Sequence, residues 1–220
     1  MAELRKVFYQ TVAELMKKDD RVVYLDADLA GALGTAELFR EFPRQAFDLG
    51  IMEANMIGVG AGMSIKGKIP FVHTFGPFAS RRVADQTFLA GCYNDANLKI
   101  IGSDPGITAE TNGGTHMPFE DMGIYCAYPN ITIMDVAEPY LLREVIRQMA
   151  SSWGVQYIRF QRKEGEAYYG GDEKIQIGKG NIVREGNDIT VIACGIEVGW
   201  ALTAAEKLAE ENIQARVVDM

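Results

Sequence analysis

Apolar and polar positions follow one another along the chain in blocks of two kinds. Six short runs are rich in β-branched and aromatic residues, a composition typical of buried strands, and they lie at residues 22–27, 45–50, 69–75, 98–103, 131–136 and 155–160. Stretches with the spacing of amphipathic helices separate them and begin near Ala2, Thr35, Met52, Ser80, Phe119 and Pro139. This alternation predicts βαβ units and therefore an α/β fold with a mainly parallel sheet.

The pattern changes after the sixth run. Residues 164–187 are polar and Gly-rich, which is typical of a crossing between domains. A strand, a helix and a strand are then predicted at 188–195, 197–212 and 214–220. Because about thirty residues cannot cover both faces of a sheet, we expect a second α/β domain that is incomplete here or completed by something else. The predicted division of the chain is 1–163, 164–187 and 188–220.

Composition narrows the class of protein. The 220 residues are 48% hydrophobic, which is enough for a globular core, and no apolar run approaches the roughly 20 residues that span a bilayer. The chain begins with an amphipathic helical pattern and not with a secretory signal, so we expect a cytoplasmic protein. A net charge of -8 argues against nucleic acid and anionic membranes as partners. Three separated cysteines and two histidines leave little material for a zinc site.

Candidate chemistry gathers where the predicted strands end. Ligands of open α/β sheets bind beyond the carboxyl ends of the strands. The polar and aromatic residues expected at that edge are Asp26, Asp28, Asp48, Glu53, Phe75, Phe78, His116 and Arg162. Structural roles compete with this interpretation, since Glu53 in the first turn of a helix gains up to about 1 kcal/mol from the helix dipole. His116 lies in a long Gly-rich loop of the kind that is usually functional, whereas His73 is expected to be a core histidine.

Several motifs resemble the transketolase family. The segment FDLGIMEANMIGVGAGMSIKGKIPFVHTFGPF is similar to the motif region of its pyrimidine-binding domain, and GGTHMPFED and YIRFQR match its later loops. The ending IACGIEVGWALTAAEKL resembles the start of the family's C-terminal domain. The resemblance covers essentially the whole chain and implies the thiamine-diphosphate-binding fold, a three-layer sandwich around a mainly parallel sheet.

The resemblance also implies roles for individual residues. Glu53 would bond the aminopyrimidine nitrogen of thiamine diphosphate, Phe75 and Phe78 would hold the pyrimidine ring, and Asp28 would lie beside the cofactor. His116 would act as the second catalytic residue, a hydrogen-bond donor and proton-transfer group for the substrate. Arg162 would bind the substrate phosphate, a role that suits its fixed fork of donors.

Four positions depart from the family pattern. Ser103 and Asp104 stand where transketolases usually have a Thr-His pair, and Asn112 stands where they have an Asp that contacts the donor sugar. Ala32 replaces a serine that helps to hold phosphate. Asp104 and Asn112 would therefore face the substrate in an altered sugar-binding part, and we expect a different ketose or 2-oxo-acid donor.

No motif in these 220 residues accounts for the diphosphate and its metal. The family uses a Gly-Asp-Gly motif followed by Asn, whereas the Gly171-Asp172 pair is followed by Glu173 in the polar crossing. We therefore expect no metal ligands in this chain. The resemblance implies that Mg²⁺ or Ca²⁺ is held by a separate N-terminal transketolase-like subunit. Pairing of pyrimidine domains about a two-fold axis would give a homodimer, and a heterotetramer with that partner.

The leading hypothesis is the C-terminal subunit of a split transketolase, a transferase of carbohydrate metabolism that moves a two-carbon ketol unit between phosphorylated sugars and is active only with its partner. A deoxyxylulose-phosphate synthase or the β subunit of a 2-oxo-acid dehydrogenase is an alternative within the same cofactor class. A non-catalytic paralogue that acts as a scaffold is an alternative of another class. A flavodoxin-like nucleotide binder is disfavoured because the strand-to-helix turns lack a convincing phosphate loop.

Overall fold

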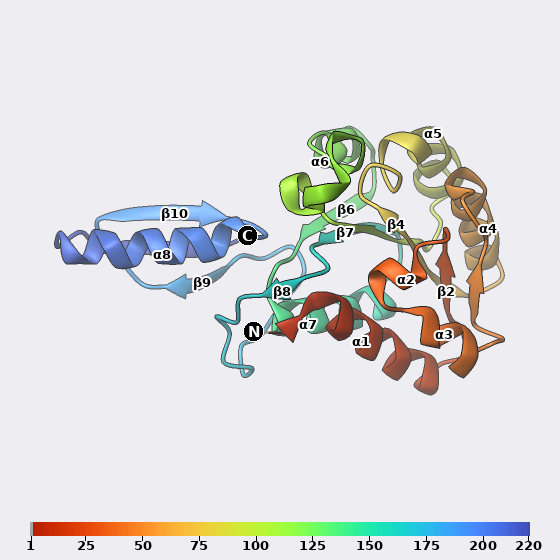
Figure 1. Ribbon diagram of the computed structural model, residues 1–220, viewed down its shortest axis with the longest axis horizontal. Helices are drawn as coiled ribbons and strands as arrows, with labels where there is room; N and C mark the ends of the chain where they lie inside the picture. The colour runs from red at the N-terminus through yellow and green to blue at the C-terminus, as the bar shows by residue number, and fades with distance from the viewer. Residues whose placement is uncertain (1) are drawn as a thin grey trace.

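The computed structural model describes residues 2–220, and a parallel sheet of six strands forms its larger domain (Figure 1). The strands are β2 (Val22–Asp26), β3 (Ala46–Asp48), β4 (Ile69–Phe75), β5 (Lys99–Ser103), β6 (Ile131–Asp135) and β7 (Val155–Phe160). Their order across the sheet is β3-β2-β4-β5-β7-β6, and every neighbouring pair is parallel. The carboxyl ends of all six strands therefore share one edge.

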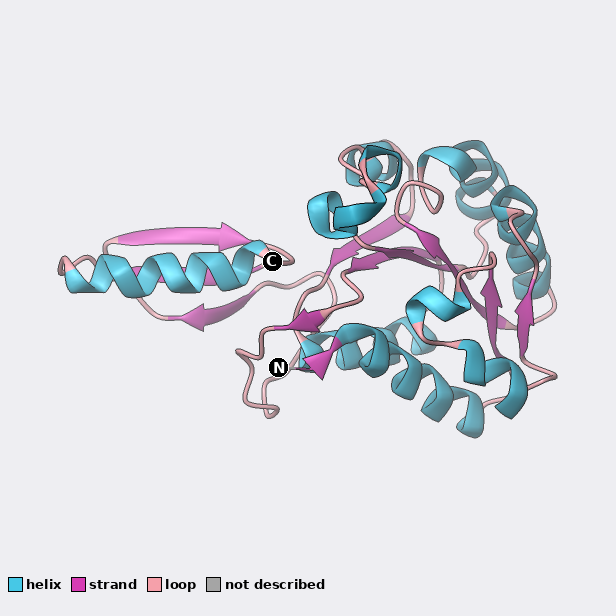
Figure 2. Cartoon of the chain, viewed as in Figure 1, coloured by secondary structure: helices cyan, strands magenta, loops and turns pink. Residues whose placement is uncertain are grey.

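Helices cover both faces of this sheet (Figure 2). One layer contains α1 (Leu4–Lys18), α2 (Ala30–Leu33), α3 (Ala36–Glu41) and α7 (Pro139–Ser151), and the other contains α4 (Glu53–Ile65), α5 (Ala84–Gln86) and α6 (Asp121–Cys126). Successive side chains of a strand point to opposite faces of the sheet and so pack against the two helix layers alternately. Phe71 packs under α1 and α7, while Val72 packs under α4. The predicted α/β fold and its three-layer arrangement are confirmed.

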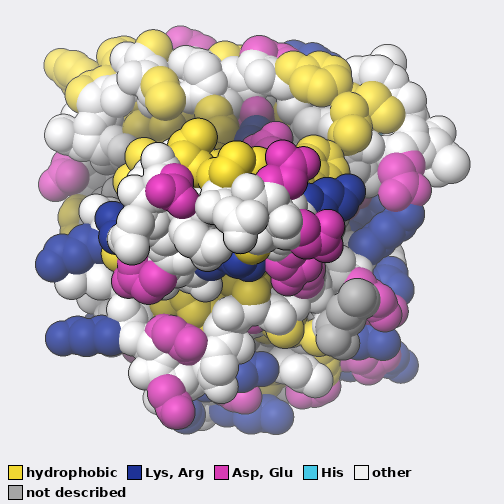
Figure 3. Space-filling view, turned by 90° about the vertical axis from the view of Figure 1, so that its left-hand side faces the viewer, with side chains coloured by type: hydrophobic (Ala, Val, Ile, Leu, Met, Phe, Trp, Pro, Cys, Tyr) yellow, Lys and Arg dark blue, Asp and Glu magenta, His cyan; other side chains and the backbone are white. Residues whose placement is uncertain are grey.

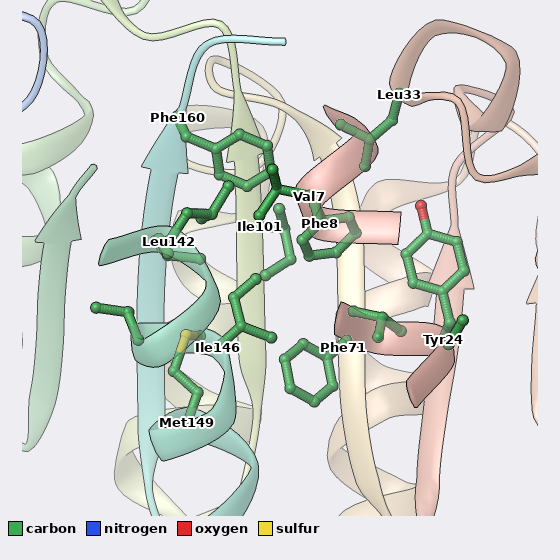
Figure 4. Packing of buried hydrophobic residues seen from close by; sticks show 14 of the residues in the cluster. Val7, Phe8, Tyr24, Leu33, Phe71, Ile101, Leu142, Ile146, Met149 and Phe160 are labelled. Atoms are coloured by element: carbon green, nitrogen blue, oxygen red, sulfur yellow. The ribbon is translucent and has the colours of Figure 1, made fainter. Parts of the chain in front are cut away.

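The core beneath α1 and α7 explains why these two helices pack so closely (Figure 4). Val7 and Phe8 project from α1, and Ile146 and Met149 project from α7, onto apolar residues of the central strands. Phe8 lies 5.4 Å from Phe160 between ring centroids. A buried side chain of this size contributes about 1.5–3 kcal/mol.

Most predicted elements are present with small differences at their ends. The strands β4 and β7 have the predicted bounds, and the others are shorter by one to three residues. The first helix begins at Leu4 because β1 (Ala2–Glu3) pairs antiparallel with β8 (Glu164–Gly165). The helix predicted near Ser80 is irregular: a 3₁₀ turn at Arg81–Val83 and α5 lead into a π-helix at Thr87–Tyr93.

A smaller unit follows the larger domain. It contains β9 (Asn181–Arg184), β10 (Ile189–Ala193), α8 (Glu197–Glu210) and β11 (Ala215–Asp219). β10 and β11 are parallel, and β9 joins the other side of β11 antiparallel. The strand β9 lies inside the segment predicted to be a crossing, so that segment is not wholly irregular. Among residues 2–220, no helix combines the length and apolar character needed to cross a bilayer.

The smaller unit presents apolar side chains along its strand β10. In Figure 3 hydrophobic side chains line the upper edge of this unit, where β10 lies in Figure 1, and Ile189 and Ile192 of β10 are 51% and 62% exposed. A cavity of about 760 Å³ separates this strand from β6 and is lined by Ile133, Val191 and Cys194 among others. The helix α8 covers only one face of the small sheet.

Candidate active site

The carboxyl edge of the large sheet carries a continuous line of side chains from Glu53 to Asp104. Each neighbour in the line is in contact with the next through an ion pair, a ring contact or a cation over a ring. In order, the residues are Glu53, Arg82, Phe78, His116, Phe75, Arg162 and Asp104. They come from α4, from the end of β4 and from the loops after β4, β5 and β7, as expected for a ligand site in a parallel sheet.

At one end of this line lies a buried carboxyl group. Glu53 is the first residue of α4, only 4% of it is exposed, and its Oε1 accepts a hydrogen bond of 2.6 Å from Nη1 of Arg82. The guanidinium carbon of Arg82 also lies 3.8 Å from the centroid of the Phe78 ring. Arg82 thus contacts both groups that the sequence assigned to a pyrimidine ring.

Three rings form the middle of the line. The His116 ring lies edge-on to Phe75 and Phe78, with centroids 5.4 and 5.2 Å away. Nδ1 of His116 is 2.9 Å from Oγ1 of Thr115, which leaves Nε2 without a hydrogen-bond partner among the described residues. The histidine can therefore present this nitrogen to a ligand over the aromatic pair.

Arg81 holds the loop that carries His116. Its guanidinium donates to the carbonyl oxygen of Thr115 at 3.1 Å and to Oε1 of Glu120 at 2.6 Å. Gly76 provides a second anchor, because a Cβ atom at this position would come within 2.6 Å of Cγ of Pro118. Close packing of Pro118 on Gly76 thus fixes the loop against the end of β4.

At the other end of the line, Asp104 clamps Arg162. The Asp104 carboxylate accepts from Nε of Arg162 at 2.5 Å and from its backbone N–H at 3.0 Å. The guanidinium carbon of Arg162 lies 4.9 Å from the centroid of Phe75, and Nη1 points to the Ala32 carbonyl oxygen at 3.4 Å. Two of the positions that depart from the family pattern, Asp104 and Ala32, are therefore neighbours of one arginine.

A buried chain of hydrogen bonds lies beneath the site. His73 joins Asp26 at 2.7 Å and Ser103 at 3.0 Å, and Asp26 also accepts from Tyr24 at 2.6 Å. Burial alone would raise the pKa of Asp26, but the charge and hydrogen bonds of His73 and the bond from Tyr24 hold this pKa below its usual value. The expectation that His73 is a satisfied core histidine is confirmed, and the chain of bonds fixes the ends of β2, β4 and β5.

Two predicted site residues lie outside the line. Asp28 is exposed and holds a left-handed backbone with φ of 62°, and its N–H donates to Asp48. Asn112 is exposed at the end of a 3₁₀ segment and has no hydrogen bond from its side chain within residues 2–220. Conversely, Arg81 and Arg82 were not predicted. The signal for them was the pair of adjacent arginines shortly after Phe78 in the loop at the carboxyl edge.

Comparison with known proteins decides the family. Residues 1–166 match the family model described as "Transketolase, pyrimidine binding domain". The chain belongs to the transketolase family. Residues 178–220 match the model described as "Transketolase, C-terminal domain". Enzymes of this family use thiamine diphosphate and a divalent metal ion.

Two relatives of this chain are subunits of transketolases. The chain is 44% identical over 217 residues to the 6-deoxy-6-sulfo-D-fructose transketolase subunit of Clostridium sp. (strain MSTE9), covering 99% of this chain and 67% of that protein. It is 30% identical to an apulose-4-phosphate transketolase subunit of Phocaeicola vulgatus, covering 100% of this chain and 71% of the other.

Solved transketolase structures share the fold. A structure described as a split gene transketolase, inactive beta4 tetramer, superposes with a TM-score of 0.89 at 34% identity and covers 99% of this chain and 70% of its own. Transketolase from Campylobacter jejuni gives a TM-score of 0.90 at 20% identity, with 99% of this chain and 35% of the other chain covered. The second similarity supports the fold alone.

The residues of this site fit part of thiamine diphosphate. A flat heteroaromatic ring could offer a nitrogen to the Glu53 carboxyl group and a face to Phe78, the two contacts that Arg82 now makes. The chain brings no group of three His, Cys, Asp or Glu side chains together in a way that could hold a metal ion anywhere in residues 2–220. The site thus suits the pyrimidine end of the cofactor.

Proposed function

We propose that this chain is the pyrimidine-binding, C-terminal subunit of a split transketolase, which transfers a two-carbon ketol unit between phosphorylated or similarly anionic sugars. The observation that carries the proposal is the unbroken line from Glu53 through Phe78, His116 and Phe75 to Arg162. Along this line, Glu53 would meet the cofactor ring, His116 would form a hydrogen bond to the substrate, and Arg162 would bind its anionic end. A ketose bound to the cofactor would meet these residues in this order.

Each residue has a separate task in this proposal. When bound, the cofactor would supply the nucleophilic carbon that takes up the ketol unit. Glu53 would hold the proton shared with the pyrimidine nitrogen, while Phe75 and Phe78 exclude water from that side of the ring. His116 would donate a hydrogen bond to a substrate oxygen and exchange its proton, and Arg162 would bind the anionic end. Asp28 and Asn112 would approach the ligands only from loops.

A partner subunit completes the proposed enzyme. The chain lacks the Gly-Asp-Gly motif of the family, so we assign the diphosphate and its Mg²⁺ or Ca²⁺ to an N-terminal transketolase-like subunit. The 34% identical split-gene structure supports this assignment because it is described as an inactive tetramer of beta chains. A cytoplasmic location and the division into 1–163, 164–187 and 188–220 belong to the same proposal.

Self-association is proposed through the outer face of α4. Asn55, Gly58 and Gly62 are exposed along this face, and the apolar Ile51 and Ile65 at its ends are 69% and 74% exposed. A Cβ atom at Gly58 or Gly62 would meet nothing within 4 Å, so packing inside the chain does not require glycine there. A smooth helix face between two apolar residues permits close approach of a second copy.

Alternative functions receive less support. The relatives named above are transketolases and not 2-oxo-acid dehydrogenases or deoxyxylulose-phosphate synthases. A scaffold would not need Glu53, Phe78 and His116 in one line of contacts. One relative is named for a sulfonated ketose and another for a phosphorylated sugar, so the names leave the terminal group of the donor open.

The first test is isothermal titration of thiamine diphosphate with Mg²⁺ into the chain, alone and mixed with an N-terminal transketolase-like subunit. Binding is expected only in the mixture. Tight binding to the chain alone would contradict the assignment of the diphosphate to the partner, and no binding in either case would favour the scaffold.

The second test is Glu53→Gln in the reconstituted enzyme. Loss of the carboxyl proton is expected to lower turnover at least about 100-fold, as for other proton-transfer groups. Glu206→Gln on the exposed side of α8 is the matched control and should leave turnover unchanged. Full activity of Glu53→Gln would show that the catalytic assignment is wrong.

A further inference from the structure

The end of the site far from Glu53 is formed by an arginine and a carboxylate. Arg162 is the cation there, and Asp104 binds it twice, through Nε and through the backbone N–H. Asp104 is 1% exposed, so solvent screens this contact very little. Because the carboxylate neutralises Arg162 in place, the arginine retains less attraction for a second anion.

Position 32, beside Nη1 of Arg162, offers no side-chain donor. This nitrogen reaches only the backbone carbonyl of Ala32, at 3.4 Å, and a methyl side chain at this position offers no hydroxyl group. Loss of a donor at Ala32 and gain of a carboxylate at Asp104 both weaken the binding of a highly charged anion. Their effects converge on the same guanidinium group.

The neighbouring cavity has balanced charges. It has a volume of about 680 Å³ and opens beside Arg162. Its lining includes the cations Arg5, Arg162 and Lys163 and the carboxylates Glu3, Asp104 and Glu164. Arg5 donates to Glu3 at 2.8 Å, and Lys163 pairs with Glu110. No cation of this wall is left without a carboxylate partner among the described residues.

From this arrangement we propose that Asp104 determines specificity: it makes the enzyme prefer a ketose that ends in a monoanionic group, of the sulfonate class, over one that ends in a phosphate dianion. The inference rests on the proposed function and names the substrate class at the same site. A phosphate ester carries a charge of about -1.5 to -2 at pH 7, whereas a sulfonate carries a single charge. Both groups present three terminal oxygens to Arg162, and the phosphate ester is longer by one bridging oxygen, so the change of preference when Asp104 is replaced isolates the effect of charge.

The Asp104 carboxylate repels the additional charge of phosphate. A unit charge within a few ångströms, partly screened by water, is expected to change the relative affinity about tenfold. Asp104 contacts neither Glu53 nor His116. The preference should therefore appear in KM for the two ketoses, with kcat nearly the same.

The test uses the enzyme reconstituted with its N-terminal subunit and loaded with thiamine diphosphate and Mg²⁺. Steady-state kinetics would compare 6-deoxy-6-sulfofructose with fructose 6-phosphate at one pH and with one common acceptor. The wild type is expected to have the higher kcat/KM for the sulfonate. Asp104→Asn is expected to raise kcat/KM for the phosphate about tenfold relative to the sulfonate, mainly through KM.

Two further variants serve as an independent test and as a control for the loss of charge. Ala32→Ser should shift the ratio in the same direction by supplying a hydroxyl donor without altering the Asp104 contact. Glu144→Gln on α7 removes the same charge at a distance and should leave the ratio unchanged. If the enzyme turned over both ketoses but the ratio of their kcat/KM values were unchanged in Asp104→Asn and Ala32→Ser, only the inference about Asp104 would be overturned. If the wild type turned over neither ketose, the proposed function would be overturned as well.

Discussion

Arg82 illustrates how one residue can join two groups at the proposed cofactor end of the site. It satisfies the buried Glu53 carboxylate and covers the Phe78 ring in the same position. An unpaired buried carboxylate is costly, so this arginine stabilises the chain when no ring is bound. A ligand that takes over both contacts would release Arg82, whose side chain is 43% exposed.

Arg82→Met is therefore expected to destabilise the cofactor-free chain. The loss should be about 1–2 kcal/mol, below the roughly 3–5 kcal/mol typical of a fully buried pair because the arginine is partly in solvent. Urea unfolding of the isolated chain measures it. Arg81→Met, which breaks the exposed pair with Glu120, should cost less than about 1 kcal/mol. Equal losses in both variants would contradict the role of Arg82.

The sequence allowed the site residues to be predicted, but not the residues with which they pair. Glu53, Phe78, His116 and Arg162 were predicted because they match family motifs at the carboxyl edge. Their actual partners were not predicted: Arg82 is 29 residues from Glu53, and Asp104 is 58 residues from Arg162. Such contacts depend on strand order and loop geometry, which no local pattern specifies.

At the scale of elements, the beginning of α7 contains a titrating cap. Glu138 is the N-cap residue, accepts a 2.6 Å hydrogen bond from the N–H of Leu141 and is 1% exposed. Burial raises the pKa of Glu138 to about 7, with a smaller contribution from the charges of Asp219 and Glu173, despite the hydrogen bonds that oppose it. The folded chain thus favours the protonated form of this cap.

Glu138 should make stability depend on pH. Since its folded pKa is raised, its contribution is fully present below the unfolded value near pH 4.5 and is lost as pH rises to about 7. The free energy of unfolding should fall by up to about 3 kcal/mol over this window. Glu138→Gln keeps an acceptor for Leu141 and should flatten the profile in urea unfolding at about pH 5 and 8.

A matched variant on the same helix separates the titration of Glu138 from the titration of other carboxylates. Glu144→Gln removes a half-buried carboxylate of α7 that pairs with Arg147, and it should keep the slope of the wild type. If Glu138→Gln retained that slope too, the pH dependence would have to come from another group.

Elements differ in how well their sequence reveals them. The central strands were predicted closely because both of their faces are buried and they read as continuous apolar runs. The strand β9 was missed since it is a short edge strand of four residues within a polar segment. The segment from Ser80 to Tyr93 could not be predicted in detail, because its change from 3₁₀ turn to π-helix follows from packing and not from periodicity.

At the scale of the whole molecule, the proposed dimer face lies on α4, at the end of the large domain away from the smaller unit (Figure 1). Gly58→Leu would fill this face without a clash inside the chain, because its Cβ atom meets nothing within 4 Å. It should also favour the helix by a few tenths of a kcal/mol up to about 1 kcal/mol. The variant is thus expected to fold normally and to lose self-association.

Light scattering at high concentration measures this outcome. The wild type should form dimers or larger assemblies, and Gly58→Leu should shift the population towards monomer with a Tm that is unchanged or higher. Gly123→Leu, at an exposed glycine of α6, should leave the assembly intact. A monomeric wild type would exclude the proposed interface.

The strand order separates the two ends of the active site in a way that matters for evolution. Glu53, Phe78 and Arg82 come from α4 and the loop after β4, whereas Asp104 and Arg162 follow β5 and β7. Substitutions at positions 104 and 32 can therefore adapt a lineage to a new carbon source while the cofactor end remains under its own constraint. Enzymes that act on unusual sugars can thus diversify by substitution at the Arg162 end of the site, without rebuilding the chemistry that they inherited.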